Sequence, residues 1–270
     1  MAQNRSVVTT SWDDGERTDL RVAELLASRK ITGTFYVPIH PYNGEPALTN
    51  SELRALSDQG FEIGAHGVNH EHMPSLSRDK TLSVVRECKN RLEVVTGQPV
   101  RMFCYPGGHY TPSTMRCLAD AGYEGARTTR MLATRPSFDR FEMPTTVQAY
   151  PHAGMTYLKN TLKAGRPARL YNYMIGGRSG WVELGKRLFD RVRREGGVWH
   201  LYGHSRELEA HGLWDEMAQL LDYVGGREGV SYLTNGDVLE LLQPGTARFR
   251  GKAMAREDTS GPQQVPTAGR

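Results

Sequence analysis

Short apolar runs alternate with longer amphipathic stretches along most of this 270-residue chain. Runs rich in β-branched and aromatic side chains predict strands, and stretches with apolar residues three or four positions apart predict helices. Regular alternation of the two is typical of β/α units with a parallel sheet or barrel. The predicted strands cover residues 7–12, 34–37, 61–63, 102–105, 123–126, 198–202 and 230–233.

Residues suited to helix ends mark where the predicted helices begin and stop. Gly60 and Gly97 each follow an amphipathic stretch, and glycine tolerates the left-handed conformation at a helix end. Thr111 and Pro112 predict an N-cap and a first helical position. The predicted helices cover residues 19–29, 51–59, 77–96 and 112–122.

The size of the chain fits one barrel-type domain, because 38% hydrophobic and 24% charged residues are enough to bury a full core. We expect this domain to span residues 5–243. Residues 244–270 are polar and rich in Gly, Pro, Thr and Arg, so a disordered tail is expected there. The less regular region 128–180 is expected to form long loops and an insertion over the barrel mouth.

The net charge of +4 is unevenly distributed, with ten Lys and Arg residues against two acids in residues 159–194. This basic stretch predicts either a solvated helix face or a cradle for a phosphate or another anionic group of a substrate. It lacks the interleaved aromatic side chains of a stacking platform, so nucleic-acid binding is not expected.

The three cysteines, Cys88, Cys104 and Cys117, form no CxxC pair and are odd in number. They therefore favour reduced, buried thiols over a disulfide framework. The first residues lead into a strand without an apolar signal region, and no stretch reaches transmembrane length. A cytoplasmic location is expected on these grounds.

Two adjacent carboxylates, Asp13 and Asp14, end the first predicted strand, where Asp-Asp-Gly is also ordinary turn chemistry. His66 and His70 follow the third predicted strand and would lie on one face if that segment forms a helical turn. With Asp14 they supply a His-His-Asp set that can hold one metal ion with positions open for water and substrate.

Two further segments carry candidate chemistry. Arg101 can hold a carboxylate ionised, and the backbone N–H groups at the turn after Tyr105 can face developing negative charge. A late strand delivers His204 to the same end of the sheet, where it can act as a general acid. His200 and His211 are alternative acids.

Taken in order, these segments resemble the polysaccharide deacetylase family, also called NodB-homology or carbohydrate esterase family 4. The resemblance spans residues 7–242 and implies a single-domain α/β fold, a distorted, TIM-like (β/α)7 barrel, with residues 5–243 as the catalytic domain. It also implies metal-dependent removal of an N- or O-acyl group from a sugar. The matching segments are Asp13-Asp14-Gly15, His66-x-x-x-His70, Arg101-x-x-x-x-Pro106 and Leu201-x-x-His204.

The resemblance implies a role for each matched residue. Asp13 would be the catalytic base, oriented by Arg101, and His204 the acid, while the Tyr105 backbone N–H would contribute to the oxyanion site. The metal ligands would be Asp14, His66 and His70.

The sequence departs from the family pattern in two places. The aspartate-tryptophan motif that tunes the acid histidine has no clear match, and Arg127-Thr128-Thr129 occupies the approximate region. The last motif departs from the usual Leu-x-His spacing and is followed by Ser205-Arg206-Glu207. The sequence therefore does not identify what tunes His204.

The expected activity is hydrolysis of an N-acyl group, acetyl or formyl, on an acylamino sugar or a sugar-containing biosynthetic intermediate. The substrate would be a small molecule or a glycan, and a phosphate on it would suit the basic stretch 159–194. Zinc is the first expectation for the metal, and Co²⁺, Ni²⁺, Mn²⁺ and Fe²⁺ suit the same ligands.

Other functions use similar residues. Hydrolysis of a non-sugar C–N bond, in an amide or ureide, fits the same fold, and so does a catalytically silent glycan-binding relative. Non-haem iron oxygenases also use two histidines and one carboxylate, but on an all-β scaffold with a His-x-Asp pair, which the alternating pattern does not favour. The sequence does not predict the oligomeric state.

Overall fold

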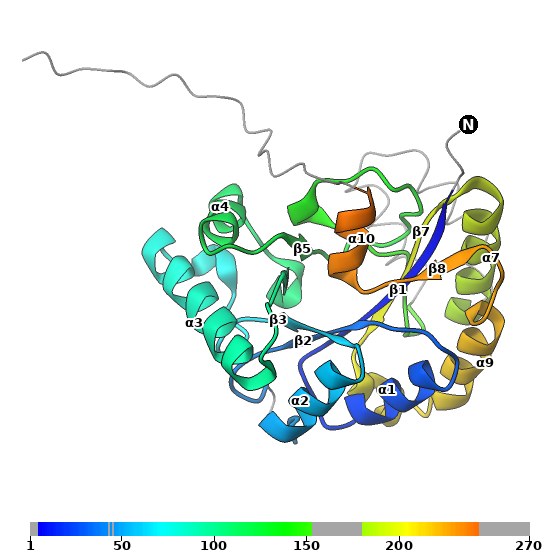
Figure 1. The fold of residues 1–270 in the computed structure, drawn as a ribbon, viewed down its shortest axis with the longest axis horizontal. Helices are drawn as coiled ribbons and strands as arrows, with labels where there is room; N and C mark the ends of the chain where they lie inside the picture. The colour runs from blue at the N-terminus through cyan, green and yellow to red at the C-terminus, as the bar shows by residue number, and fades with distance from the viewer. Residues whose placement is uncertain (1–4, 43, 45, 153–179, 243–270) are drawn as a thin grey trace, which may run out of the picture.

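In the computed structural model, which describes residues 5–42, 44, 46–152 and 180–242, eight parallel strands form one curled sheet (Figure 1). The strand order is β5-β4-β3-β2-β1-β7-β6, and β8 pairs with β1. The predicted distorted (β/α)7 barrel is confirmed. The strands are β1 (Ser6–Asp13), β2 (Thr34–Val37), β3 (Glu62–Ala65), β4 (Met102–Cys104), β5 (Gly125–Arg127), β6 (Val147–Gln148), β7 (Gly197–Gly203) and β8 (Val230–Tyr232).

Two short contacts curl the sheet towards closure. Arg127 at the end of β5 forms an isolated parallel bridge with Met143, whose N–H donates to the Ala126 carbonyl oxygen at 2.9 Å. The same segment continues into β6, where Val147 pairs with Leu201 of β7. The two outer strands of the sheet are thereby linked through one stretch of chain.

Helices pack on the outer face of the sheet, as Figure 1 shows for the α1, α2 and α3 side. Their ends follow the predicted chemistry. Thr49 accepts a hydrogen bond from the Glu52 N–H, Glu52 accepts one from the Thr49 N–H, and Gly97 ends a helix with φ of 70°. The helices are α1 (Asp19–Ala27), α2 (Asn50–Asp58), α3 (Arg78–Thr96), α4 (Pro112–Asp120), α7 (Gly180–Glu195), α8 (Ser205–Ala210), α9 (Trp214–Val224) and α10 (Asn235–Leu242), with 3₁₀ helices η1 (Met73–Ser75), η2 (Pro106–Gly108) and η3 (Arg140–Glu142).

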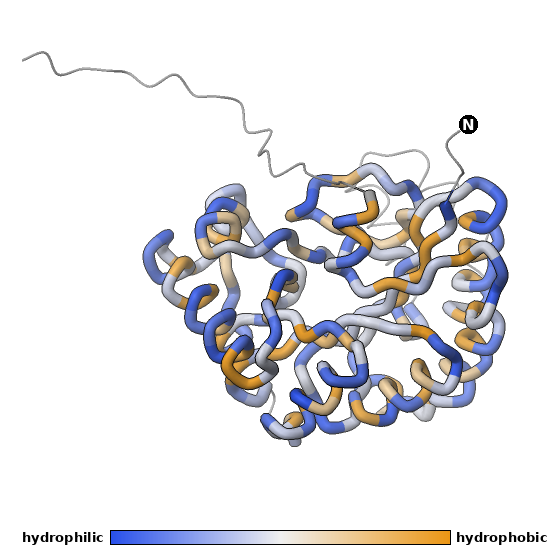
Figure 2. Tube along the Cα trace, viewed as in Figure 1, coloured by the Kyte–Doolittle hydropathy of each residue, from blue (hydrophilic) through white to orange (hydrophobic). Residues whose placement is uncertain are grey.

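The central strand β1 is buried on both faces along its whole length. Alternate side chains therefore enter two different environments. Val8 and Trp12 belong to the large apolar core between the sheet and the helices. Figure 2 shows hydrophobic and hydrophilic positions alternating along the helices that cover this core. Val7 belongs to a smaller cluster that includes Val238 and Leu239 of α10.

Polar side chains of β1 are hydrogen-bonded on the same face as Val7. Thr9 Oγ1 donates to Asn235 Oδ1 at 2.8 Å, and Ser11 Oγ lies 2.8 Å from His200 Nε2. Asp13 is the next residue in this alternation. The polar side chains that precede Asp13 on this face are therefore hydrogen-bonded and hold fixed positions.

The region 128–180 differs in part from its prediction as loops and insertion. Residues 147–148 form the strand β6, which pairs with the distant strand β7. A strand of two residues has no recognisable sequence pattern, so it was not predicted. Residues 153–179 lie outside the described part, as does the predicted tail from 244 onward.

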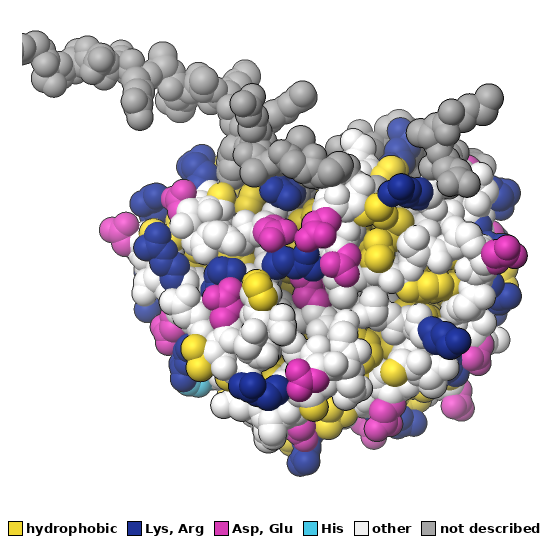
Figure 3. Space-filling model, in the orientation of Figure 1, with side chains coloured by type: hydrophobic (Ala, Val, Ile, Leu, Met, Phe, Trp, Pro, Cys, Tyr) yellow, Lys and Arg dark blue, Asp and Glu magenta, His cyan; other side chains and the backbone are white. Residues whose placement is uncertain are grey.

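The described part of the basic stretch belongs to α7. Lys186 pairs with Glu183 at 2.9 Å and Arg191 with Glu195 at 2.8 Å, as on a solvated helix face. On the face shown in Figure 3, acidic and basic side chains lie intermixed rather than in separate patches. Among the described residues, no helix combines the length and apolar character needed to cross a bilayer.

Candidate active site

The carboxyl ends of four strands meet at one edge of the barrel. Because the strands are parallel, the residues that end them or directly follow them share that edge. Five of these residues, joined by His70 from a loop, lie together there. The five are Asp13 and Asp14 after β1, His66 after β3, Arg127 of β5 and His204 after β7, and His70 lies in the loop beyond β3.

Asp14 and two histidines form a compact donor set. Asp14 Oδ1 lies 3.5 Å from Nε2 of His66 and 3.5 Å from Nε2 of His70. This oxygen is buried and has no hydrogen-bond partner among the described residues, which is costly for a carboxylate unless a cation faces it. Donors held at about 2.0–2.2 Å from one ion must lie within about 4.4 Å of one another. Both histidine nitrogens meet this limit with Asp14 Oδ1, and all three donor atoms lie within 4.8 Å of one another, so the set could hold one divalent metal ion.

The orientation of both histidines suits this role. His66 Nδ1 lies 2.9 Å from the Cys104 carbonyl oxygen, so this nitrogen donates and Nε2 is the nitrogen that faces Asp14. Burial lowers the pKa of His66, but Cys104 and the Asp14 carboxylate outweigh it and raise the pKa well above its ordinary value, so a metal ion would have to displace the Nε2 proton. Burial, followed by the charge of His66, lowers the pKa of His70 to about 4. Its ring also stacks on Tyr42, with ring centroids 3.8 Å apart. A neutral, oriented imidazole is what metal binding requires.

A loop, rather than a helical turn, brings the two histidines together. Gly67 has φ of 87° and His70 has φ of 53°, both in the left-handed region. Glu71 Oε2 accepts the Val68 N–H at 3.0 Å and closes the turn. Asp14 is also left-handed, with φ of 79°, and non-glycine residues in this region cluster at functional sites.

Asp13 is buried, and its two carboxylate oxygens have different partners. Its Oδ1 accepts a hydrogen bond from Nη2 of Arg127, while its Oδ2 lies 3.7 Å from Cys104 Sγ and 3.9 Å from His204 Nε2. Burial raises the pKa of Asp13, but the charges of Arg127, His66 and His204 together outweigh it and hold the pKa below its ordinary value. Asp13 is therefore an ionised carboxylate with one oxygen directed into the site.

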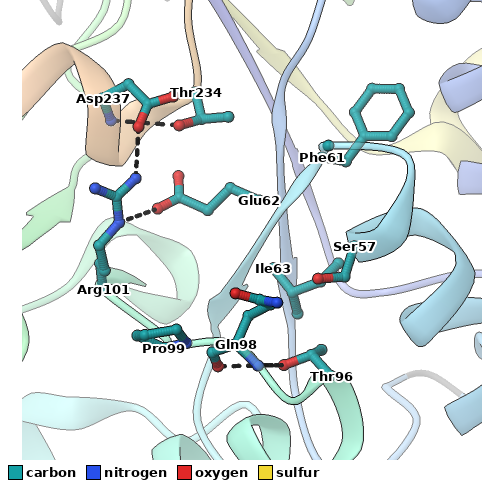
Figure 4. Close-up of a pocket in the computed structure, with 11 residues that line it drawn as sticks. Ser57, Phe61, Glu62, Ile63, Thr96, Gln98, Pro99, Arg101, Thr234 and Asp237 are labelled. Atoms are coloured by element: carbon teal, nitrogen blue, oxygen red, sulfur yellow. Dashed lines mark hydrogen bonds and ion pairs between the residues drawn. The ribbon is translucent and has the colours of Figure 1, made fainter.

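Arg101 does not contact Asp13, so the predicted pairing is wrong. Arg101 precedes β4 and therefore lies at the amino end of the barrel, opposite the site. Its guanidinium binds Asp237 Oδ1 at 2.7 Å and Glu240, and its Nε lies 3.7 Å from Glu62 (Figure 4). Glu62, Arg101 and Asp237 form part of the wall of a pocket of about 410 Å³, which is also lined by Ser57 of α2 and Thr96 of α3.

Arg127 holds the place that was predicted for Arg101. Its side chain is fully buried, with the guanidinium carbon 5.3 Å from the ring centre of Tyr36 and 5.0 Å from that of Tyr202. These aromatic faces and Asp13 compensate the buried charge. The sequence could have indicated this role, because Arg127 directly follows the predicted strand 123–126.

His204 lies between both aspartates and a third carboxylate. Its Nε2 is 3.9 Å from Oδ2 of Asp13 and of Asp14, and its Nδ1 is 3.1 Å from Glu207 Oε2. Burial lowers the pKa of His204, but the hydrogen bond to Glu207 and the charge of Asp13 outweigh it and raise the pKa above its usual value. Gln148 Nε2 donates to the same Glu207 oxygen at 3.1 Å. Sequence reasoning missed Glu207, although its i,i+3 spacing from His204 predicts contact on a helix.

The other candidate groups are placed differently. His200 lies inside the barrel, bound to Ser11 and the Pro144 carbonyl, and burial with the charge of Arg127 lowers its pKa to about 3. The Tyr105 N–H is directed to the Arg127 carbonyl oxygen at 3.4 Å, which is longer than an ordinary hydrogen bond. Its oxyanion role stays a prediction.

A second missed arginine binds the metal-ligand candidate Asp14. Arg206 Nη1 lies 2.6 Å from Asp14 Oδ2 and 2.7 Å from Glu16 Oε1. Glu16 is buried, and its other oxygen accepts the backbone N–H of Arg206 at 2.9 Å. The first turn of α8 thus supplies both Arg206 and Glu207 to the site.

Comparison with known proteins agrees with this geometry. The profile of the polysaccharide deacetylase family matches residues 1–126, which contain Asp13, Asp14, His66 and His70. The likeness to this family therefore covers the first 126 residues of the chain. His204, Arg206 and Glu207 lie outside the matched part.

Two curated relatives show the same likeness over part of their length. A peptidoglycan-N-acetylglucosamine deacetylase of Bacillus cereus is 26% identical over 123 residues, covering 45% of this chain and 55% of that protein. The peptidoglycan-N-acetylmuramic acid deacetylase PdaA of Bacillus subtilis is 24% identical over 86 residues, covering 32% of this chain and 31% of that protein. The matches thus span about half and a third of these relatives.

Solved structures share the fold over most of the chain. A candidate polysaccharide deacetylase from Mycobacterium smegmatis aligns with a TM-score of 0.60 at 14% identity, over 90% of this chain and 92% of that chain. A carbohydrate esterase family 4 pseudoenzyme from Bacillus anthracis aligns with a TM-score of 0.51 at 17% identity, over 87% and 66%. The fold shared with these structures therefore extends beyond residue 126.

Proposed function

We propose that this protein is a metal-dependent deacetylase that removes an N-acyl group from an acylamino sugar. The observation that carries the proposal is the shared position of Asp14, His66 and His70 beside a buried base and a half-buried acid. The matched family and the two peptidoglycan deacetylase relatives support an acylated sugar as the substrate. We propose zinc as the ion, with Co²⁺, Ni²⁺, Mn²⁺ and Fe²⁺ as substitutes on the same donors.

Asp14, His66 and His70 would hold a divalent ion, which when bound supplies a Lewis acid and lowers the pKa of water. Asp13 takes the proton from the attacking water, because it is ionised and its Oδ2 is free of Arg127. Arg127 keeps this carboxylate fixed through Oδ1, so that the base is preorganised.

His204 donates a proton to the leaving nitrogen, without which cleavage of the C–N bond would expel a poor anion. Its Nε2 faces the two aspartates, on the side where the acyl group must lie. Glu207 binds the opposite nitrogen and fixes which nitrogen carries the mobile proton.

A substrate panel tests the proposal directly. The metal-free chain, reconstituted with Zn²⁺, is incubated with acetylated and formylated amino sugars in free, nucleotide-linked and polymeric forms, and acetate and formate release is measured. We expect acetate release that is lost with a chelator and restored by Zn²⁺ or Co²⁺. Release that survives complete metal removal would contradict the proposed mechanism, and no release from any sugar would favour a non-sugar amide or a silent relative.

The variant Glu207→Gln tests how His204 is tuned. We expect turnover of an acylamino sugar to fall by about tenfold or more, a part of the roughly 10²–10⁴-fold that a positioned acid supplies. The substitution removes the carboxylate bound to Nδ1, so the imidazolium is less stabilised. Hydrolysis of an aryl acetate, whose leaving group needs no proton, should change much less.

Glu209→Gln is the matched control, because Glu209 lies on the same helix and contacts Arg21 and Trp214 instead of His204. This variant should hydrolyse the acylamino sugar and the aryl acetate at the wild-type rate. Equal losses on the amide and the aryl ester in Glu207→Gln would show that Glu207 does not act through the acid.

A further inference from the structure

Arg206 occupies one oxygen of the carboxylate that is proposed to bind metal through the other. Its Nη1 lies 2.6 Å from Asp14 Oδ2, whereas Asp14 Oδ1 faces His66 and His70 at 3.5 Å. The two oxygens of one buried carboxylate therefore have separate partners. A carboxylate can bind a metal through one oxygen or through both, and the second oxygen here is already taken.

The position of Arg206 is fixed by neighbours on several sides. The same Nη1 binds Glu16 Oε1 at 2.7 Å, and Glu16 Oε2 accepts the Arg206 backbone N–H at 2.9 Å. The guanidinium carbon lies 5.8 Å from the ring centre of Tyr42, whose other contact is the stack on His70. Glu16 is 4% exposed, so this is not a solvent-separated surface ion pair.

We propose that Arg206 restricts Asp14 to coordination through Oδ1 and thereby keeps a coordination position free for water and substrate. The inference rests on the proposed function only in that Asp14 is a metal ligand. A catalytic site needs such an open position, whereas a structural site fills it with protein ligands. Arg206 acts through Asp14 and is a positioning residue, not a group that touches the substrate.

The charge of Arg206 has a second consequence. A guanidinium beside a ligand carboxylate repels a divalent cation and weakens the donor, so Arg206 lowers metal affinity. Glu16 offsets part of this repulsion through its own contact with Arg206. Arg206 therefore lowers the affinity for the metal ion and keeps a coordination position free for water and substrate.

Co²⁺ binding to the full chain tests the inference without relying on activity, because the visible absorption of Co²⁺ reports its coordination geometry. In Arg206→Gln, Asp14 Oδ2 is free to bind Co²⁺ as a further ligand. Because Co²⁺ with more ligands absorbs more weakly, we expect a weaker visible absorption band than in the wild type. We also expect Co²⁺ to bind about tenfold or more tightly in competition with a chelator, because a nearby positive charge is gone.

The control is Arg17→Gln, because Arg17 is 65% exposed and pairs with Glu52 rather than with Asp14. Its band and affinity should match the wild type. If Arg206→Gln does not fold because Glu16 is left unpaired, the double variant Glu16→Gln/Arg206→Gln removes that charge and carries the same expectation. An unchanged band and affinity in the folded variant would overturn the inference and leave the deacetylase proposal intact, whereas a wild type that binds no Co²⁺ would overturn both.

Discussion

Replacing Asp13 by asparagine is expected to lower turnover by about 10²–10⁴-fold, the range that a positioned base contributes, with metal still bound. The substitution keeps the shape of the side chain and removes its ability to accept a proton from water. It leaves Asp14, His66 and His70 unchanged, so the metal content should stay at one ion per chain. Deacetylation kinetics and metal analysis on the same sample separate the two effects.

Cys104→Ala is the matched control for this experiment. Cys104 Sγ lies 3.7 Å from Asp13 Oδ2 and is equally buried, but a thiol there moves no proton in the proposed reaction. Its turnover should stay within a few-fold of the wild type. A near-wild-type rate in Asp13→Asn would remove Asp13 as the base, and loss of the metal would instead make it a ligand.

The predicted site residues that the structure brings together share one geometric property. Asp13, Asp14, His66 and His204 each end or follow a predicted strand, and parallel strands deliver their carboxyl ends to one edge. This rule needs only the position of each strand along the chain. It does not depend on which helices or loops connect the strands.

The same rule explains the error at Arg101. The predicted strand 102–105 begins after Arg101, so this residue belongs to the amino end, where Glu62 and Asp237 bind it (Figure 4). Arg127 follows the predicted strand 123–126 and satisfies the rule. The pairing of Arg127 with Asp13 spans 114 positions, and no local pattern shows which arginine faces which carboxylate.

Other parts of the site depend on contacts that no local pattern encodes. The loop from His66 to His70 uses left-handed backbone at Gly67 and His70, where the four-residue spacing alone suggested a helical turn. Arg206 reaches Asp14 across 192 positions. Each of these contacts appears only when the barrel closes.

The largest effect on stability is expected for Arg127→Met. In the metal-free protein we expect the free energy of unfolding to fall by about 3–5 kcal/mol, because Asp13 is left buried without its partner. The guanidinium is fully buried between Tyr36 and Tyr202, so water does not screen the pair. Chemical denaturation in the presence of a chelator measures this change without a contribution from bound metal.

A double-mutant cycle with Asp13→Asn separates the ion pair from general damage to the core. The double variant should be less destabilised than the sum of the two single variants, with a coupling of about 0.5–3 kcal/mol, because it leaves no unpaired charge. Arg101→Met is the matched control. Its partners Asp237 and Glu240 are 43% and 63% exposed, and its buried partner Glu62 keeps hydrogen bonds from Thr34 Oγ1 and the Gly236 N–H, so the variant should destabilise less and leave turnover unchanged. Additive losses in the cycle would show that Arg127 does not stabilise Asp13. A loss of turnover in Arg101→Met would return the orienting role to Arg101.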